Sequence, residues 1–410
     1  MVIQKIVVIL IDIYLIVKNI RKKIFIMLKE SLLSDNKPIR IKFNIPIPVD
    51  IIRIKNILKE KGYKLFIVGG ATRDAYLGKP IKDYDLVTNA LPDIVQEILT
   101  PYYKTLETGK VFGVINVLTS SGEFEIATMR KDVGSGRRPD SVEFTTIDQD
   151  YKRRDLTINS LYYDIDTSEI IDYAGGVEDL KNGVIRTVGR AEDRFTEDRL
   201  RIMRIIRFSG RFGSELDPEA DEALKKDSSL EGVSGERIRD EFIKGIKSAK
   251  SVVHFLRLLE KYNLFQWIFG PLILKERGMQ ALDFIEEKDV PVLIAYLLQD
   301  NNVDFVKKEL NKLKYTTDEI SQIAFLLNLK NISPDKVFKL KKIQANSKLS
   351  DEQIKKFAHW NNMDTKLIDA FLKFKLSVTG QELMQQGFKG KSLGDEIERR
   401  EIENFKASLT

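Results

Sequence analysis

The 410-residue sequence contains no cysteine and only two histidines, His254 and His359. Disulfide bonds, thiolate zinc sites and a cysteine nucleophile are therefore excluded, and we expect a reducing compartment, the cytoplasm. The two histidines are far apart in sequence, which excludes a histidine-rich metal centre of the phosphohydrolase type. A catalytic metal would have to be held by carboxylates, and this favours magnesium or manganese.

The excess of charge of one sign is also small. The chain has 67 Lys and Arg against 61 Asp and Glu, a formal net charge of +6, which permits a polyanionic partner without establishing one. The apolar stretch in residues 1–17 is interrupted by Lys5 and Asp12 and is short for a membrane span. Residues 1–26, before the second methionine Met27, are interpreted as an upstream extension or a mis-called start. A membrane anchor is the less favoured alternative, and no stable membrane association is expected.

The periodicity of the sequence changes at about residue 191. Before it, strand patterns alternate with helical ones, and after it helical periodicity continues to the C-terminus. The length is enough for roughly two to four domains. We predict an N-terminal extension over 1–49, an α+β head over 50–190, a neck over 191–250, a helical body over 251–330 and a helical tail over 331–410.

Within the head, local patterns predict several elements. A helix over 50–62 leads to a strand over Leu65–Val68. Two strand-like runs, Phe112–Leu118 and Glu123–Met129, flank a turn and predict a hairpin. The segment Lys131–Asp140 is rich in Gly, Arg and Lys, and we predict a mobile loop there.

The glycine pair Gly69-Gly70 follows the apolar strand, and Asp83 and Asp85 come shortly afterwards. Glycines let backbone N–H groups approach a phosphate closely, and a helix N-terminus favours an anion. Residues i and i+2 of a strand point to the same face, so the two carboxylates can converge on a divalent cation. This pattern predicts a site where a metal and a triphosphate meet.

Arg73 and Glu125 extend this site. Two metal ions can activate an attacking hydroxyl and stabilise a leaving pyrophosphate. A third carboxylate from a neighbouring strand usually completes such a centre, and Glu125 is the candidate. A lone Asp-x-Asp is more often a solvated turn. Here the glycine pair and Arg73 upstream favour the functional interpretation.

A second polar motif spans residues 153–159. Arg153 and Arg154 can bind phosphates in bidentate fashion or contact a ribose. Thr157 and Asn159 are compact groups that can hydrogen-bond a sugar. The alternative is a charged helix start capped by Asp155, and from these residues alone the two interpretations are equal.

The segment 197–207 carries a third pattern, with Asp198, Arg201 and Arg204 at i, i+3 and i+6 of a predicted helix. An Asp accepts a hydrogen bond from an exocyclic amino group and an Arg donates to ring acceptors, so together they can imitate the Watson–Crick edge that reads C or A. A salt-bridged amphipathic helix, with Met203 and Ile206 in the core, is the preferred interpretation of this segment in isolation.

Five motifs in chain order resemble those of class II tRNA nucleotidyltransferases, the CCA-adding enzymes, in the family that also contains bacterial poly(A) polymerases. They are GG-x-x-R-D…D-x-D at 69–85, RRD-x-T-x-N at 153–159, GG-x-x-D-L at 175–180, ED-x-x-R at 197–201 and S-x-E-R-I…E at 234–241. A weaker likeness to the family's tail continues over 379–394, where Glu382 replaces the usual Asp.

The resemblance implies a DNA polymerase β-like head, a mixed sheet with helices, followed by an elongated all-helical neck, body and tail. It also implies addition of C and A to the tRNA 3′ end from CTP and ATP. By this resemblance, Asp83 and Asp85 would bind Mg²⁺, and Gly69, Gly70 and Arg73 would bind the triphosphate. Arg154, Asp155 and Asn159 would bind the nucleotide. Asp198 and Arg201 would pair with its base, and Arg204 and Arg207 would support that base-reading pair or the phosphates. The predicted loop 131–140 would correspond to the segment linked to the switch from C to A addition.

Alternatives remain open within and outside the family. Asn159–Tyr163 resembles the poly(A) polymerase version of the motif, although the long basic C-terminal extension expected of that enzyme is not apparent. Further rivals are a CC-adding or A-adding enzyme, a non-catalytic RNA-binding protein on the same scaffold, and a transferase acting on a protein or small molecule.

The tail would bind tRNA, with Lys336–Lys348 and Lys355–Lys356 as candidate basic tracts. The sequence does not establish the oligomeric state.

Overall fold

The computed structural model describes residues 37–109, 113–133, 141–274 and 289–409. The chain divides into two compact units, one comprising residues up to Asn182 together with Arg186–Arg190, the other comprising Gly183–Ile185 and the chain from Ala191 onward. The long segment of the second unit therefore begins at Ala191, the residue at about which the sequence periodicity changes. The finer division into neck, body and tail stays a prediction.

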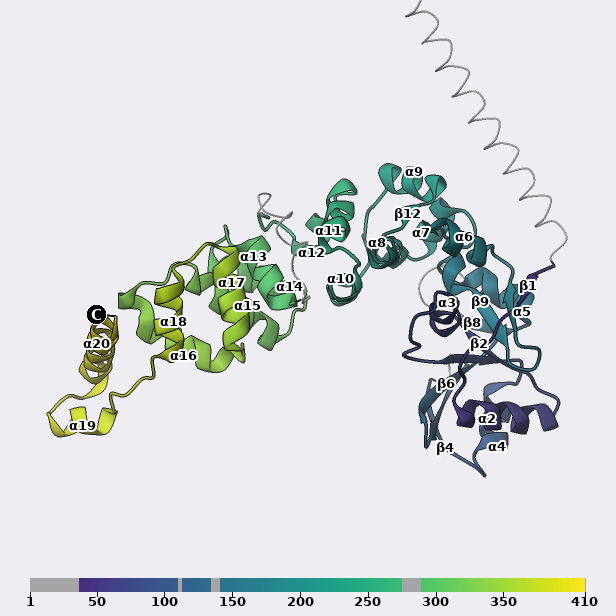
Figure 1. The fold of residues 1–410 in the computed structure, drawn as a ribbon, viewed down its shortest axis with the longest axis horizontal. Coiled ribbons are helices and arrows are strands. Elements are labelled where there is room, and N and C mark those ends of the chain that lie inside the picture. Colours follow the sequence, from purple (N-terminus) through teal and green to yellow (C-terminus); the bar gives the residue numbers. More distant parts are fainter. Residues whose placement is uncertain (1–36, 110–112, 134–140, 275–288, 410) are drawn as a thin grey trace, which may run out of the picture. The chain divides into compact units, whose positions relative to one another are not determined.

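The described part of the first unit is built on an eight-stranded sheet in the order β1-β10-β9-β2-β3-β6-β5-β4 (Figure 1). Only the β3–β6 pair is parallel among these neighbours. A separate ribbon pairs β7 with β8. The strands are β1 Ile39–Lys42, β2 Leu65–Val68, β3 Asp85–Thr88, β4 Lys104–Gly109, β5 Val114–Thr119, β6 Gly122–Thr128, β7 Arg130–Val133, β8 Ser141–Phe144, β9 Leu161–Asp164 and β10 Glu169–Asp172.

Both faces of the sheet are buried at its centre, in β2 and β9, where strand residues alternate between two apolar layers. Leu65 and Ile67 of β2 join the core beneath α2 (Val49–Glu60), α3 (Gly70–Tyr76) and α4 (Pro92–Leu99). On the other face Phe66 and Val68 pack with Tyr162, next to α5 (Ile147–Asp150) and the 3-10 turn at 151–153. The predicted helix over 50–62, the strand over 65–68 and the hairpin are confirmed.

Two features of the head differ from the prediction. Strand β1 lies inside the segment assigned to the N-terminal extension, and its pairing with β10 makes the head sheet begin at Ile39. Residues 131–133 form part of β7 because they pair with β8, so the predicted loop is shorter. The rest of that loop, 134–140, lies outside the described residues, as do residues 1–26, Met27 and Phe112.

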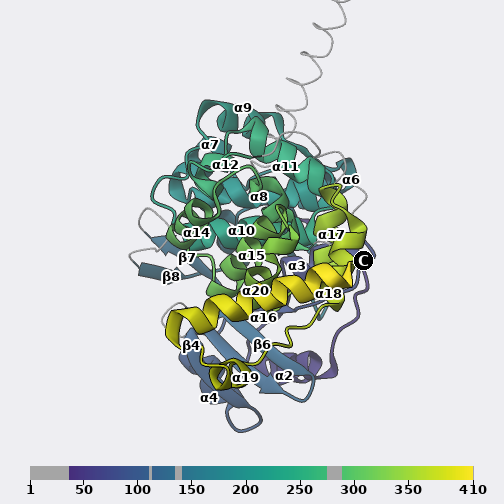
Figure 2. The same ribbon diagram turned by 90° about the vertical axis from the view of Figure 1, so that its left-hand side faces the viewer.

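In the described residues of the second unit, the regular structure is helical apart from a short parallel pair, β11 (Val184–Ile185) with β12 (Glu215–Leu216). Its longest helix, α20, lies against α16 (Figure 2). In the described residues no helix is both long and apolar enough to span a bilayer. The helices are α7 Ala191–Glu197, α8 Leu200–Phe212, α9 Pro218–Lys226, α10 Gly235–Ser248, α11 Val252–Lys261, α12 Phe265–Phe269, α13 Val290–Leu298, α14 Val303–Lys312, α15 Thr317–Leu329, α16 Val337–Ser347, α17 Asp351–Trp360, α18 Thr365–Lys373, α19 Gly380–Gln385 and α20 Gly390–Ser408.

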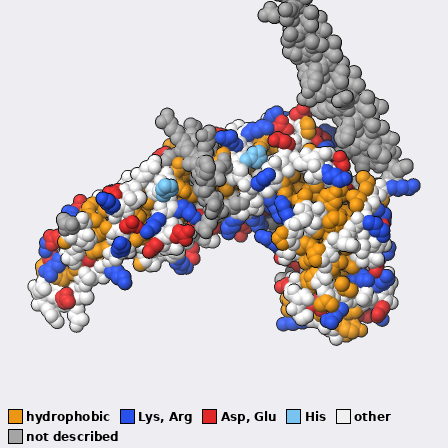
Figure 3. Space-filling model, in the orientation of Figure 1, with side chains coloured by type: hydrophobic (Ala, Val, Ile, Leu, Met, Phe, Trp, Pro, Cys, Tyr) orange, Lys and Arg blue, Asp and Glu red, His pale blue; other side chains and the backbone are white. Residues whose placement is uncertain are grey.

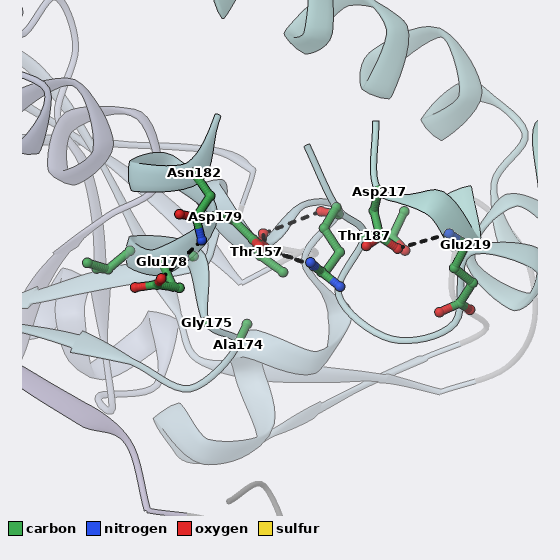
Figure 4. Close-up of polar contacts among 12 residues, drawn as sticks. Thr157, Ala174, Gly175, Glu178, Asp179, Asn182, Thr187, Asp217 and Glu219 are labelled. Atoms are coloured by element: carbon green, nitrogen blue, oxygen red, sulfur yellow. Dashed lines mark hydrogen bonds and ion pairs between the residues drawn. The ribbon is translucent and has the colours of Figure 1, made fainter. Parts of the chain in front are cut away.

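Helix α6 (Gly176–Asn182) fixes the polar motif at 153–159. The Asp172 carboxylate accepts backbone N–H bonds from residues 174–177 at 2.9–3.1 Å and so starts the helix. Asp179, one turn on, accepts from the Thr157 hydroxyl at 2.7 Å and from Arg186 Nε at 3.1 Å (Figure 4). The GG-x-x-D-L element is therefore a support for the segment that contains Thr157.

Gly176 sits where no side chain fits. A Cβ there would lie 2.2 Å from the Thr157 carbonyl oxygen, far inside van der Waals contact. We therefore predict that Gly176→Ala displaces the 157–159 turn, destabilises the protein by about 1–3 kcal/mol and lowers nucleotide binding. Gly394→Ala is the control, because nothing lies within 4 Å of a Cβ at that position. Chemical denaturation and equilibrium nucleotide binding test this, and equal stability of the two variants would contradict it.

Candidate active site

The glycine turn, the acidic pair and the 153–159 motif meet at one end of strand β2. Gly69 adopts φ 72°, a left-handed conformation that favours glycine, just before α3 begins. A Cβ on Gly69 would lie 3.6 Å from the carbonyl oxygen of Asn159 and 3.8 Å from Oδ2 of Asp85. Two sequence motifs separated by about seventy residues of chain thus form a single site, as their functional interpretation requires.

Arg73 lies beneath this turn in a buried hydrogen-bond network. Its side chain is only 4% exposed and donates to Asp74 Oδ1 at 2.9 Å and to the Asn159 side-chain oxygen. Asn159 in turn donates to Asp155 Oδ1 at 3.1 Å. Three of the predicted nucleotide-binding residues are therefore held to one another. This arrangement makes Arg73 an organising residue of the site as well as a source of positive charge.

Asp83 and Asp85 are both exposed. Strand β3 begins at Asp85, which pairs with Val68, whereas Asp83 belongs to the segment before the strand. The pKa of Asp85 is raised, first by desolvation and also by the Asp83 charge, against the opposing effects of Arg154 and Arg73. The pair thus concentrates negative charge next to two guanidinium groups.

The two aspartates fit a divalent cation. Both are hard oxygen ligands, and their mutual repulsion is relieved when a cation binds between them. Glu125 is exposed on β6, and the register Leu86↔Ile126 places it beside Asp85 in the sheet. Over the described ranges, however, no three acidic or histidine side chains gather into a metal-binding group. The participation of Glu125 stays a prediction.

Arg154 is the second guanidinium group that acts on the acidic pair. Its guanidinium receives support from two buried groups, the Tyr162 hydroxyl, 2.8 Å from Nε, and the Asp150 carboxylate at 3.1 Å. The Arg154 charge lowers the pKa of Asp85, so the guanidinium lies within electrostatic range of the acids. The side chain is 16% exposed. This geometry suits a cation that meets an anionic ligand while its inner side stays anchored.

The proposed base-reading residues lie in the second unit. Asp198 occupies the break between α7 and α8, which corrects the prediction of one continuous helix through Asp198 and Arg201. Its carboxylate accepts from Leu200 N and from Arg237, both at 3.1 Å. Arg201 donates to Glu197 at 2.6 Å and to the Arg194 carbonyl at 3.0 Å. Both side chains are therefore fixed by neighbours.

Arg204 and Arg207 point to the same acidic residue on α10. Glu241 is buried and accepts from Arg207 Nε at 2.6 Å, while Arg204 lies 3.7 Å from its other oxygen. Met203 and Ile206 are buried, as predicted. These contacts give the S-x-E-R-I…E motif a structural role, because Glu241 of α10 holds Arg204 and Arg207 of α8 and Arg237 holds Asp198 just before that helix.

Three of the candidate RNA-binding lysines are paired with acids. Lys339 lies 3.6 Å from Glu398, and Lys355 lies 2.8 Å from Asp369. Lys348 forms an ion pair with Asp318 at 2.7 Å. Basic and acidic side chains are interspersed over this part of the visible surface (Figure 3). The basic tracts predicted from sequence are thus balanced locally, which weakens the argument for them as RNA contacts.

Asp150, Tyr162 and Asp172 are the important residues that sequence reasoning missed. Asp150 precedes Arg153 and Arg154 by three and four residues, a spacing typical of helical ion pairs. Asp172 stands shortly before two glycines, a position where an Asp side chain often closes a turn. Both signals were present in the sequence. Tyr162 had none, because an apolar strand gives no indication of what a hydroxyl contacts.

Two sequence-family descriptions match the chain. The "Poly A polymerase head domain" matches residues 65–186, and the "Probable RNA and SrmB- binding site of polymerase A" matches residues 213–275. The CCA-adding enzyme of Bacillus subtilis (strain 168) is 41% identical over 207 residues, which cover 50% of this chain and 51% of that enzyme. That of Ligilactobacillus salivarius (strain UCC118) is 42% identical over 191 residues, 46% of each chain. The chain thus matches about half the length of these curated relatives.

Solved structures extend the likeness over most of the chain. The CCA-adding enzyme of Bacillus stearothermophilus in complex with CTP aligns with a TM-score of 0.66 and 25% identity, covering 88% of this chain and 92% of that one. A CCA-adding enzyme complex with ATP aligns with a TM-score of 0.64 and 22% identity, covering 92% and 94%. The mixed-sheet head and the helical C-terminal region are therefore a known fold. The chain is therefore similar to CCA-adding enzymes and to the poly(A) polymerase head domain, in sequence over about half of its length and in fold over most of it.

Proposed function

We propose that this protein is a tRNA nucleotidyltransferase that adds C and A residues to the tRNA 3′ end, using CTP and ATP and no nucleic-acid template. The observation that carries the proposal is the convergence of Asp85, the Gly69 turn and Arg154 in the head. The same chain carries a fixed Asp198 and Arg201 in the second unit. The first set serves phosphoryl transfer, and the second offers a donor and an acceptor to a base. The named relatives support the same activity.

In the proposed reaction the tRNA 3′-hydroxyl attacks the α-phosphate of the NTP and pyrophosphate leaves. Asp83 and Asp85 would hold Mg²⁺, which would neutralise phosphate charge and activate the hydroxyl. Arg154 adds positive charge on the phosphate side, and the Gly69 turn lets the backbone approach the triphosphate. Positioning and charge neutralisation supply most of the catalysis in such reactions.

Base selection would depend on hydrogen-bonding side chains whose directions the protein fixes before the nucleotide binds. Asp198 keeps acceptor capacity beyond its two present donors, because a carboxylate has about four lone-pair sites. The Arg201 guanidinium has five donors. Arg204 and Arg207 would keep α8 in place through Glu241.

The proposed neck over 191–250 carries this base-reading group, and the proposed body over 251–330 and tail over 331–410 would bind the tRNA. The paired lysines indicate that this binding depends on shape and on backbone contacts more than on a strongly basic surface.

An A-adding enzyme, a CC-adding enzyme or a poly(A) polymerase would use the same active-site groups. A non-catalytic RNA-binding protein is disfavoured, because among the described residues no side-chain hydrogen bond or ion pair holds Asp83 and Asp85 at the surface.

Three tRNA transcripts distinguish these activities: one ending before CCA, one after the first C and one after CC. With labelled CTP and ATP, we expect each to be completed to a single CCA end, after which addition stops. Sequencing of the product ends measures this. A run of A residues would identify a poly(A) polymerase, extension of only the CC-ended transcript an A-adding enzyme, and no incorporation a binding protein.

The role of the acidic pair is tested by Asp83→Asn. This variant keeps the size of the side chain and removes the charge that a divalent cation needs. We expect incorporation to fall by at least a thousandfold, with tRNA affinity unchanged in a gel-shift assay. Asp93→Asn, at an exposed position in the first turn of α4, serves as the control. Wild-type activity of Asp83→Asn would remove Asp83 from the metal site.

The base-reading role is tested by Asp198→Ala. Loss of one hydrogen-bonding group from a base-reading pair costs about 1–3 kcal/mol of discrimination. We therefore expect the preference for CTP and ATP over UTP and GTP to fall about 10- to 100-fold, measured as ratios of kcat/KM. Asp193→Ala on the exposed face of α7 is the control. Unchanged ratios in a folded Asp198→Ala protein would contradict the assignment.

A further inference from the structure

A fully buried acid, Asp150, lies outside all of the recognised motifs. It ends α5 and is 0% exposed. Oδ1 accepts from the backbone N–H of Arg130 and from Arg153 Nε, both at 2.9 Å. Oδ2 accepts from the Tyr162 hydroxyl at 2.6 Å and from Arg154 at 3.1 Å. Each oxygen therefore receives two donors, which is the condition for keeping a buried carboxylate charged.

Tyr162 completes a closed triangle with Asp150 and Arg154. Its ring is buried in the second face of the sheet, and its hydroxyl both donates to Asp150 and accepts from Arg154 Nε at 2.8 Å. The Arg154 guanidinium also lies over the Tyr162 ring, 4.9 Å from its centre. Two nitrogens of a planar group are thus fixed at once, which determines the direction of the whole guanidinium.

The electrostatics agree with this geometry. Burial raises the pKa of Asp150, but Arg154, Arg153 and the Tyr162 hydrogen bond outweigh that effect and lower it overall. The carboxylate is therefore ionised at neutral pH. Arg154 in turn lowers the pKa of Asp85. The guanidinium thus stands between an anchored negative charge inside the protein and the acidic pair at the surface.

The same carboxylate also holds the start of the ribbon β7–β8. Oδ1 binds the N–H of Arg130, the first residue of β7, and Arg153 Nε donates to the Arg130 carbonyl at 3.1 Å. The position of Arg154 is therefore tied to that of the ribbon. Support of the ribbon uses only Oδ1 of Asp150. The second oxygen, Oδ2, contacts Arg154 and Tyr162 instead, so supporting the ribbon does not account for it.

We propose that Asp150 and Tyr162 are positioning residues that hold the Arg154 guanidinium for the triphosphate of the incoming nucleotide. The inference rests on the proposed function only in taking an NTP as the ligand of Arg154. A mobile arginine would lose side-chain entropy whenever a nucleotide bound, and the triangle removes that cost in advance. Neither residue touches the reacting atoms in this scheme.

A double-mutant cycle with Tyr162→Phe and Arg154→Ala tests the proposal. Tyr162→Phe keeps the ring and removes the hydroxyl. Because hydrogen bonds to charged groups are worth about 1.5–3 kcal/mol, we expect CTP and ATP to bind about tenfold or more weakly in equilibrium titrations with Mg²⁺. In the Arg154→Ala background the same change should have no further effect, because it acts through Arg154. KM should rise more than kcat falls.

Tyr163→Phe is the matched control, since Tyr163 follows in the same strand and is buried in the opposite face. It should leave nucleotide affinity unchanged. Asp150→Asn, if folded by circular dichroism, should reproduce the Tyr162→Phe effect and show the same lack of additivity with Arg154→Ala. Unchanged affinity in Tyr162→Phe, or additive effects in the cycle, would overturn the proposal, as would failure of the unaltered protein to bind NTPs.

Failure of the proposed function gives a different result. If the protein binds CTP and ATP, shows the non-additive cycle and extends no tRNA transcript, the positioning role stands and the transferase activity is wrong. If tRNA is extended and the effects are additive, the activity stands and the positioning role is wrong.

Discussion

The site depends above all on the register between strands β2 and β3. Val68 pairs with Asp85, so the strand that ends in the Gly69 turn lies directly beside the strand that begins with the acid. A shift by one residue would turn Asp85 toward the opposite face, where α2, α3 and α4 pack. Because β2 is apolar at every position and buried on both faces, its own hydrophobic pattern does not set this register. The pairing of β2 with β3 and β9 does, and it determines where the proposed metal-binding charge lies.

Several buried charges in the head are compensated from more than one direction. Arg73 is held by Asp74 and Asn159, and Asp172 by four consecutive backbone N–H groups. An unpaired buried charge would cost several kcal/mol, so each of these networks must form completely or not at all. This makes the site rigid before any nucleotide binds. The exposed acids Asp83 and Asp85 are the part left unbalanced, and they are where a cation is expected.

The sequence was sufficient to predict the pieces of this site and insufficient to predict how they are supported. The glycine pair and the Asp-x-Asp pattern have local chemical meaning, so Gly69 and Asp85 could be assigned from spacing alone. The contact between Gly69 and Asn159 depends on the pairing of β2 with β9, which is a property of the sheet. Tyr162 illustrates the same limit, since its hydroxyl reaches Asp150 only when β9 and α5 are packed together.

The extension predicted over 1–49 failed to include β1 in the head for a related reason. Strand β1 is a short edge strand with alternating charged residues, Arg40 and Lys42, and both pair with Glu169 on β10. Such an edge strand has little hydrophobic pattern of its own. Its partner is about 130 residues away in sequence, so only the folded sheet identifies it.

The two residues proposed to read the base, Asp198 and Arg201, already have hydrogen-bond partners within the protein. Asp198 binds Arg237, and Arg201 binds Glu197. If these partners were obstacles, reading a base would first require breaking two ion pairs. Carboxylates and guanidinium groups have more hydrogen-bonding positions than one partner uses, so a base can be added to the existing contacts. The existing contacts fix the directions of the two side chains, so under the proposed function selection among bases would be a matter of geometry set before the nucleotide arrives.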